Sequence, residues 1–206
     1  MPTVLATDVF GATPHVLGLA RRLEAAAPQA APVRVLDPYA GEAPGFADQD
    51  AAYAAFVQGP GPAAYAEHVA RAATALGPGV LLVGMSAGAT ACWLALGADD
   101  PPPAARAALF YGTRIREHTD MAPACPVSCI WAREAHMDTH ALAARLARIP
   151  GVDSLHADAD HGFFNPGSPG YDAYAAEHWA AWLAGFLRRH AHPSHNGETA
   201  WTGSSS

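Results

Sequence analysis

The sequence predicts an α/β fold: a mainly parallel, doubly wound sheet of about six strands flanked by helices. Short apolar segments typical of buried strands alternate along the chain with segments of helical periodicity, and this alternation favours parallel strands joined by crossover helices. The run Val80-Leu81-Leu82-Val83 is apolar at every position, as in a strand buried on both faces. At 206 residues with 50% apolar and 15% charged side chains, one globular domain is the expectation.

The individual elements are predicted from apolar periodicity and from helix-capping residues. Thr13-Pro14 has the residues of a helix start, with threonine as the N-cap and proline in the first turn. The segment 40–62 is rich in Gly, Pro and Asp, which indicates a loop with a short helix around 51–57. We expect strands at 3–8, 33–36, 79–83, 107–112, 126–131 and 151–157, and helices from 13, at 65–76, after 86, at 139–148 and from near 171.

Two expectations concern how these elements are arranged. The strand ending at Asp8 should lie beside the strand ending at Gly84. The domain should span residues 1–190, and the polar segment 191–206 should be a disordered tail.

Composition excludes several functional classes. The formal net charge is −7, which gives no electrostatic support for a nucleic-acid partner. No run approaches the roughly 20 apolar residues of a membrane span, and no signal peptide is visible, so we expect neither a membrane partner nor export. Cys92, Cys125 and Cys129 lack metal-type spacing and are interpreted as reduced thiols, which favours a cytoplasmic location. No cofactor is indicated, and His190, His192 and His195 do not predict a physiological metal site.

The segment Gly84-Met85-Ser86-Ala87-Gly88 predicts a nucleophile elbow. It is a Gly-x-Ser-x-Gly motif between a buried strand and a segment that can continue as a helix, which is the context that the motif requires. Without a Cβ, Gly84 and Gly88 let the strand and the helix approach closely around Ser86. Ser86 is therefore the candidate nucleophile.

A serine nucleophile needs a base to take its proton and an acid to orient that base. His161, 75 residues after Ser86, follows the last predicted strand and is the candidate base. The loop after the fifth predicted strand contains two acids, Glu134 and Asp138. We favour Glu134 because it is nearer the strand end and has a longer side chain, and Asp138 is the alternative. The backbone N–H groups of Ala87 and Val9 are the candidate oxyanion donors, and the N-terminus of the following helix favours negative charge.

Over about residues 3–188 the chain resembles the dienelactone hydrolase family of α/β-hydrolases. The resemblance depends on several short segments that occur in the family's order, which are Thr7-Asp8-Val9-Phe10-Gly11, Asp37-Pro38-Tyr39-Ala40, Gly84–Gly88, Phe110-Tyr111-Gly112, Asp160-His161-Gly162-Phe163 and Gly170-Tyr171-Asp172. It implies hydrolysis of small esters or lactones, a sheet that lacks the family's N-terminal hairpin, and a pocket that is shallow or lined by the loops at 10–15, 40–62 and 113–124. Asp8 and Phe10 are implied as further site residues.

Three positions depart from the family pattern. Ser86 stands where the family's namesake has a cysteine nucleophile. The family's aspartate falls on Ala135, so Glu134 would substitute for it or the triad would be incomplete. Phe164 and Asn165 occupy a region where the namesake has a substrate-binding arginine, which makes dienelactone itself a doubtful substrate.

The leading hypothesis is a serine hydrolase that cleaves a small carboxylic ester or lactone through an acyl-enzyme. The alternative is a non-catalytic protein of the same fold that binds a small molecule or a partner, for which Ala135 is the reason. A dinucleotide-binding domain is disfavoured, because the motif at Ser86 lacks the middle glycine of that fingerprint.

Overall fold

A six-stranded sheet forms the centre of the protein in the computed structural model, which describes residues 1–41 and 45–191. The strand order is β2-β1-β3-β4-β5-β6, and each of the neighbouring pairs is parallel. β1 lies beside β3, with Ala6 opposite Gly84, as predicted. The strands are β1 (Thr3–Ala6), β2 (Val33–Leu36), β3 (Val80–Met85), β4 (Ala104–Phe110), β5 (Val127–Arg133) and β6 (Val152–Asp160).

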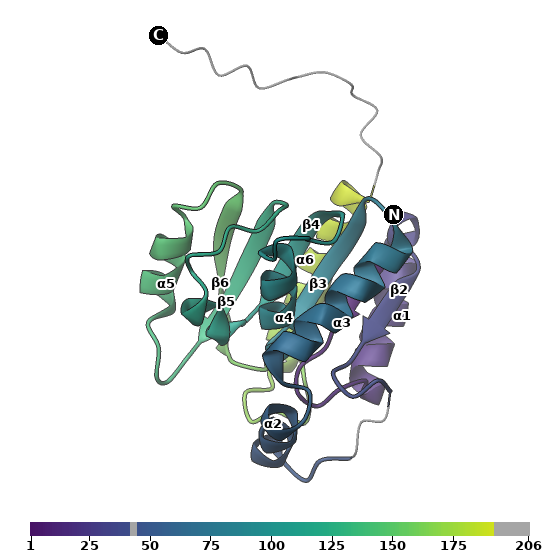
Figure 1. The fold of residues 1–206 in the computed structure, drawn as a ribbon. Helices are drawn as coiled ribbons and strands as arrows, with labels where there is room; N and C mark the ends of the chain where they lie inside the picture. The colour runs from purple at the N-terminus through teal and green to yellow at the C-terminus, as the bar shows by residue number, and fades with distance from the viewer. Residues whose placement is uncertain (42–44, 192–206) are drawn as a thin grey trace.

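Helices cover both faces of the sheet (Figure 1). α3, α4 and α5 pack on one face, whereas α1 and α6 pack on the other. The helices are α1 (Pro14–Ala26), α2 (Gln49–Gln58), α3 (Gly61–Leu76), α4 (Ala87–Leu96), α5 (Thr139–Leu146) and α6 (Ala173–His190), with short 3-10 helices η1 (Pro28–Ala30) and η2 (Thr113–Glu117). The doubly wound α/β fold predicted from the sequence is therefore confirmed.

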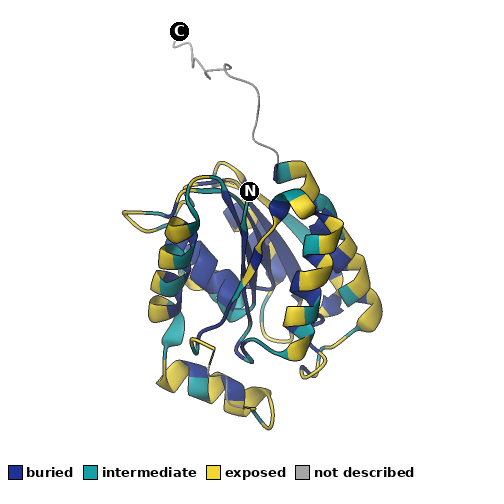
Figure 2. Ribbon diagram, turned by 90° about the vertical axis from the view of Figure 1, so that its right-hand side faces the viewer, coloured by how far each residue is buried: buried dark blue, intermediate teal, exposed yellow. Residues whose placement is uncertain are grey.

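The apolar residues of β3 contribute side chains to the hydrophobic cores on both faces of the sheet. Every residue of β3 is buried; Leu82 belongs to the core under α3 and α4, and Leu81 to the core under α1 and α6. Because successive side chains of a strand point to opposite faces, a strand between two helical layers must be apolar throughout. Figure 2 shows this arrangement, with buried strands between helices whose outer surfaces are exposed.

The segment between β2 and β3 differs most from the sequence expectation. It contains α2, near the predicted position, but α3 already begins at Gly61, where a loop was expected. Proline in the first turn of α3 suits a helix start, a signal masked by the many Gly and Pro residues around it. α2 lies beyond the carboxyl ends of the strands (Figure 1), where ligand sites of parallel sheets form.

Several helix and strand boundaries in the structure also differ from the predicted ones. β4 begins at Ala104 rather than 107, and β6 continues to Asp160 rather than 157. Of the predicted polar tail, only Ala191 is described; His192 and His195 lie outside the described residues, as does the rest of that segment.

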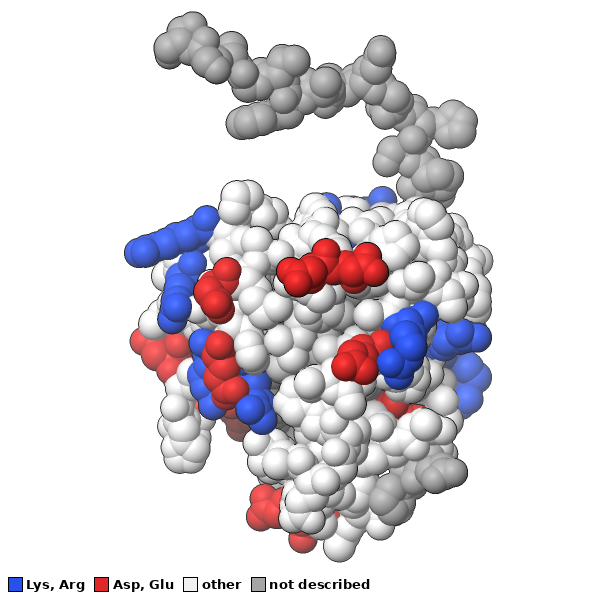
Figure 3. Space-filling view, in the orientation of Figure 1, with Lys and Arg blue, Asp and Glu red and all other residues white. Residues whose placement is uncertain are grey.

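Charges of both signs are interspersed on the face shown in Figure 3, between wide uncharged areas. Among the described residues, no helix combines the length and the hydropathy needed to cross a bilayer.

Candidate active site

Ser86 lies at a sharp turn between β3 and α4. Its backbone has φ 52° and ψ −111°, which is strained for a residue with a side chain. The turn depends on Gly88: a Cβ at that position would lie 2.3 Å from the Ala6 carbonyl oxygen. Ser86 precedes the first turn of α4, so its hydroxyl is near the positive end of the helix dipole.

His161 follows β6 directly and faces Ser86. The Ser86 Oγ and the His161 Nε2 are 2.9 Å apart, which is hydrogen-bonding distance. The turn after the histidine uses Gly162, whose φ is 82°. The aromatic ring of Tyr111 packs beside the imidazole, with ring centroids 4.9 Å apart.

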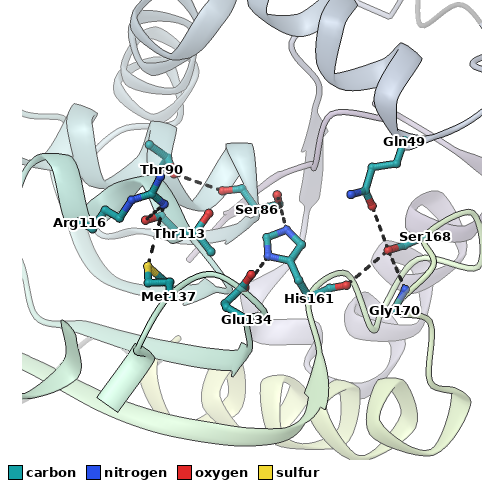
Figure 4. A network of polar contacts seen from close by, with 10 residues as sticks. All are labelled: Gln49, Ser86, Thr90, Thr113, Arg116, Glu134, Met137, His161, Ser168 and Gly170. Atoms are coloured by element: carbon teal, nitrogen blue, oxygen red, sulfur yellow. Dashed lines mark hydrogen bonds and ion pairs between the residues drawn. The ribbon is translucent and has the colours of Figure 1, made fainter. Parts of the chain in front are cut away.

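Glu134 contacts the other side of the imidazole. Its Oε1 lies 2.7 Å from the His161 Nδ1, so the three side chains form one continuous chain of hydrogen bonds (Figure 4). Asp138 lies elsewhere: its carboxylate caps α5 by accepting the N–H groups of His140 and Ala141, both at 3.0 Å.

An irregularity in the β5–β6 pairing brings Glu134 and His161 together. Trp131 pairs with His156, but Arg133 pairs with Asp160, so β6 contains extra residues just before the histidine. Bulges of this kind bend a strand and change the direction of its end. Glu134 and His161 directly follow the last pair, Arg133 and Asp160, and the Arg133 side chain also bonds the Asp160 carboxylate.

The loop after β1 forms another wall of the site. Its Val9–Phe10 peptide is held at both ends: the Tyr39 hydroxyl donates to the Val9 carbonyl at 2.7 Å, and the Phe10 N–H donates to Asp8 Oδ1 at 2.9 Å. Burial, followed by the nearby Asp8 and Asp37 charges, raises the pKa of Tyr39 to about 12, so its hydroxyl keeps the donated proton. Among the described residues, the Val9 N–H has no protein acceptor.

The carboxyl of Asp8 is the most unusual group near this wall. Burial raises its pKa, an effect opposed by hydrogen bonds from Asn165 and Phe10 and by the proximity of His161. The Asn165 Nδ2 donates to Asp8 Oδ2 at 2.8 Å. Asn165 and Tyr39 were not predicted as site residues. Tyr39 was noted only within a segment of the family resemblance and Asn165 only as a departure from the family pattern, and the partner of each is distant in sequence.

A cavity of about 350 Å³ lies at the carboxyl ends of the strands. Its walls come from the β1 loop, from α2 and from η2, close to the loops at 10–15, 40–62 and 113–124 implied by the family resemblance. Ser86, Ala87, Val9, Phe10, Asp8, Glu134 and His161 all line it, and Tyr53, Phe56 and Pro62 supply apolar surface.

Polar contacts fix the position of α2 on the cavity. Ser168, in the segment after His161, has its hydroxyl 3.3 Å from the Gln49 Oε1 and 3.4 Å from the His161 carbonyl (Figure 4). Phe56 packs edge-on against Tyr65 of α3, with ring centroids 6.2 Å apart. α2 is therefore attached both to the histidine loop and to the helical layer.

Within residues 1–41 and 45–191, no group of three or more His, Cys, Asp and Glu side chains is arranged to hold an ion. Each of the three cysteines is a free, buried thiol.

Comparison with known proteins places the sequence that forms this site in a family. The model of the dienelactone hydrolase family matches residues 61–190, which include Ser86, Glu134 and His161 but not the β1 loop. A search of curated proteins finds no match.

Solved structures share the fold at low sequence identity. One is a dienelactone hydrolase-like promiscuous phosphotriesterase from metagenomic libraries, 21% identical with a TM-score of 0.62, covering 92% of this chain and 86% of its own. Another is an esterase from Pyrococcus furiosus, 13% identical with a TM-score of 0.55, covering 93% of this chain and 83% of its own. Because the family model spans well over half of the sequence, the chain belongs to the dienelactone hydrolase family and is a hydrolase of the α/β-hydrolase fold.

Proposed function

We propose that the protein is a serine hydrolase that cleaves a small carboxylic ester or lactone through an acyl-enzyme. The observation that carries this proposal is the unbroken hydrogen-bond chain Ser86–His161–Glu134 on the wall of the cavity. Nucleophile, base and acid are in contact in the order that acyl transfer requires.

In the first half of the reaction, Ser86 Oγ bonds to the substrate carbonyl carbon while its proton passes to His161 Nε2. Glu134 holds the imidazole in the tautomer that accepts this proton and stabilises the resulting imidazolium. The carbonyl oxygen becomes an oxyanion, for which the N–H groups of Val9 and Ala87 are the proposed donors. The carbon–oxygen bond to the leaving group then breaks, and His161 returns the proton to that oxygen.

In the second half, a water molecule attacks the acyl-enzyme. His161 takes the proton of this water, the oxyanion forms again, and the carboxylic acid leaves as Ser86 recovers its proton. A lactone follows the same steps, except that its leaving hydroxyl stays attached to the acyl part.

The cavity supports a small substrate. A volume of about 350 Å³ is at the lower end of the range for small-molecule sites, and the apolar wall from Tyr53, Phe56 and Pro62 suits a hydrocarbon acyl or alcohol group. The non-catalytic alternative depended on Ala135, and the contact between Glu134 and His161 supports a triad whose acid comes from another position. A cytoplasmic location remains our proposal, supported by the three unpaired cysteines.

The test is hydrolysis of p-nitrophenyl acetate together with labelling by a fluorophosphonate. Ser86→Ala should abolish labelling, and both Ser86→Ala and His161→Ala should lower kcat on the order of 10³-fold or more, because the two residues act as a unit. Ser154→Ala, which removes a hydroxyl of β6 that bonds Trp131 outside the cavity, is the matched control and should keep labelling and turnover. Near-normal turnover by both site variants would refute the proposal.

A further inference from the structure

Asp8 connects two loops that come from opposite ends of the chain. One carboxylate oxygen accepts the Phe10 N–H at 2.9 Å, within the loop after β1, and the other accepts the Asn165 side-chain amide at 2.8 Å. Asn165 is buried and belongs to the loop after His161. The two residues are separated by 157 positions in the sequence.

Asn165 is itself fixed by its own loop. Its Oδ1 accepts the Gly167 N–H at 2.9 Å, and its backbone N–H donates to the Gly162 carbonyl at 2.9 Å. The side-chain amide therefore has its oxygen directed to one loop and its nitrogen to the other. This complementarity defines the orientation of the amide, since reversing it would place two donors against each other at Gly167.

The Val9 N–H is positioned through this arrangement. The Val9 N–H belongs to the Asp8–Val9 peptide, whose carbonyl accepts the Thr7 hydroxyl at 3.1 Å and the Gly11 N–H at 3.2 Å. In the next peptide, the Val9 carbonyl accepts from Tyr39 and the Phe10 N–H donates to Asp8. Both planar peptides that flank the Val9 Cα are therefore held by hydrogen bonds, and the second of them depends on the Asp8 carboxylate. Rigid supporting bonds of this kind matter because an oxyanion donor must be placed to within a fraction of an ångström.

Asp8 has no hydrogen bond to Ser86 among the described residues. Its effect on the reaction would therefore pass through the backbone that it holds. Leaving either of its partners unmatched would be costly, because a buried polar group without a partner loses its hydration without compensation.

We propose that Asp8 and Asn165 form a positioning pair that fixes the Val9 N–H relative to His161, by joining the loop after β1 to the loop after the histidine. The inference builds on the proposed function, since it assigns to this pair the alignment of the oxyanion donor with the base. Asp8 and Asn165 are proposed as positioning residues, because among the described residues neither side chain has a hydrogen bond to Ser86 or to the imidazole of His161.

Three variants test the pair. Asp8→Asn leaves one acceptor oxygen at position 8 for two donors, the Phe10 N–H and the Asn165 side-chain amide. Asn165→Ala keeps the carboxylate of Asp8 but removes the hydrogen bond that joins the two loops. Each should lower kcat for p-nitrophenyl acetate by about 10- to 100-fold while KM changes by less than about threefold, because the transition-state oxyanion is the species affected.

The exchange variant Asp8→Asn/Asn165→Asp should recover most of the lost kcat. In this variant, the side-chain oxygen at position 8 accepts the Phe10 N–H, and the side-chain NH₂ at position 8 donates to the carboxylate at position 165. That carboxylate also accepts the Gly167 N–H. Donors and acceptors are complementary again, with their direction reversed. A merely structural loss would lower the melting temperature without this selective recovery of kcat.

Asp172→Asn is the matched control. Asp172 is the N-cap of α6, where its carboxylate accepts from Tyr174 and Ala175, and asparagine caps a helix equally well. Its turnover should equal that of the wild type.

The outcomes separate this inference from the proposed function. If wild-type turnover does not depend on Ser86, the proposed function fails. If it does, unchanged kcat in Asn165→Ala overturns the positioning pair and leaves the serine hydrolase in place. An exchange variant that folds, with a wild-type melting temperature, and stays as slow as Asp8→Asn overturns the pair as well, because the site then requires a carboxylate at position 8 itself.

Discussion

At the scale of single residues, we propose that Glu134 takes the role of the family's aspartate from a neighbouring position. The family resemblance implies that its aspartate falls on Ala135, which has no carboxylate. Glutamate has one more methylene group than aspartate, and from one position earlier the Glu134 Oε1 reaches to 2.7 Å from the imidazole. The Glu134 side chain is 15% exposed, so its contact with the imidazole is largely shielded from water. A charged hydrogen bond is stronger in such a shielded position than at the surface.

Replacing Glu134 by glutamine should lower kcat by about 10³-fold or more and change KM little, since the amide can hold the wrong tautomer and cannot stabilise the imidazolium. Steady-state kinetics with p-nitrophenyl acetate measure both constants. Asp138→Asn is the control, because asparagine caps α5 as well as aspartate does, and its kcat should stay within about twofold of the wild type. A large loss in Asp138→Asn together with a small one in Glu134→Gln would transfer the role to Asp138.

At the scale of elements, the site depends on how closely α4 packs against β1. Gly88 is in the first turn of α4, and a Cβ there would be 2.3 Å from the Ala6 carbonyl oxygen and 2.5 Å from that of Thr7. These are backbone atoms at the end of the strand that leads to Asp8 and Val9. The elbow and the β1 loop are therefore held together by backbone contact rather than by flexible side chains.

Gly88→Ala should destabilise the protein by about 1–3 kcal/mol or more, because the backbone of β1 cannot move away without disturbing its pairing with β3. Unfolding in guanidinium chloride measures the change. The matched control is Gly18→Ala in α1, where the nearest atom to a new Cβ is the Arg21 Nη2 at 4.0 Å.

Gly18→Ala should stabilise the protein by about 0.5–1 kcal/mol, the usual gain from alanine within a helix. Equal effects of the two substitutions would contradict the close approach of α4 and β1.

At the scale of the whole molecule, the hydrophobic core under α1 and α6 anchors the loop that contains His161. Phe110, at the end of β4, packs edge-on against Phe163 and Phe164, which follow His161, and against Trp179 of α6. The histidine loop is therefore anchored to the sheet and to the last helix at once. α6 ends at His190, and the buried Ala191 closes its last turn by donating to the Leu187 carbonyl at 2.9 Å.

We propose that residues 1–190 form the α/β-hydrolase domain and fold without the segment that follows, and removal of residues 192–206 tests this. The melting temperature should stay within about 2 °C and kcat/KM within about twofold, since every buried residue of α6 is kept. Calorimetry and the ester assay provide the two readouts. A shorter chain ending at Trp182 is the control: it also loses Leu183, Phe186 and Leu187, which are buried, and should not fold. A strongly lowered melting temperature in the first truncation would contradict the domain boundary.

The sequence by itself determined what depends on local pattern. The order of strands and helices, the all-apolar β3 and the turn at Ser86 follow from residue periodicity and from glycines that lie within a few positions of one another. The tertiary structure alone decided what depends on distant partners. The β5–β6 register places Glu134, rather than Asp138, beside His161. Asp8 meets Asn165 across 157 positions, and α2 closes one side of the cavity. The physical reason is that a side chain's partner across the fold is set by strand register and loop path, which no local pattern in this chain records.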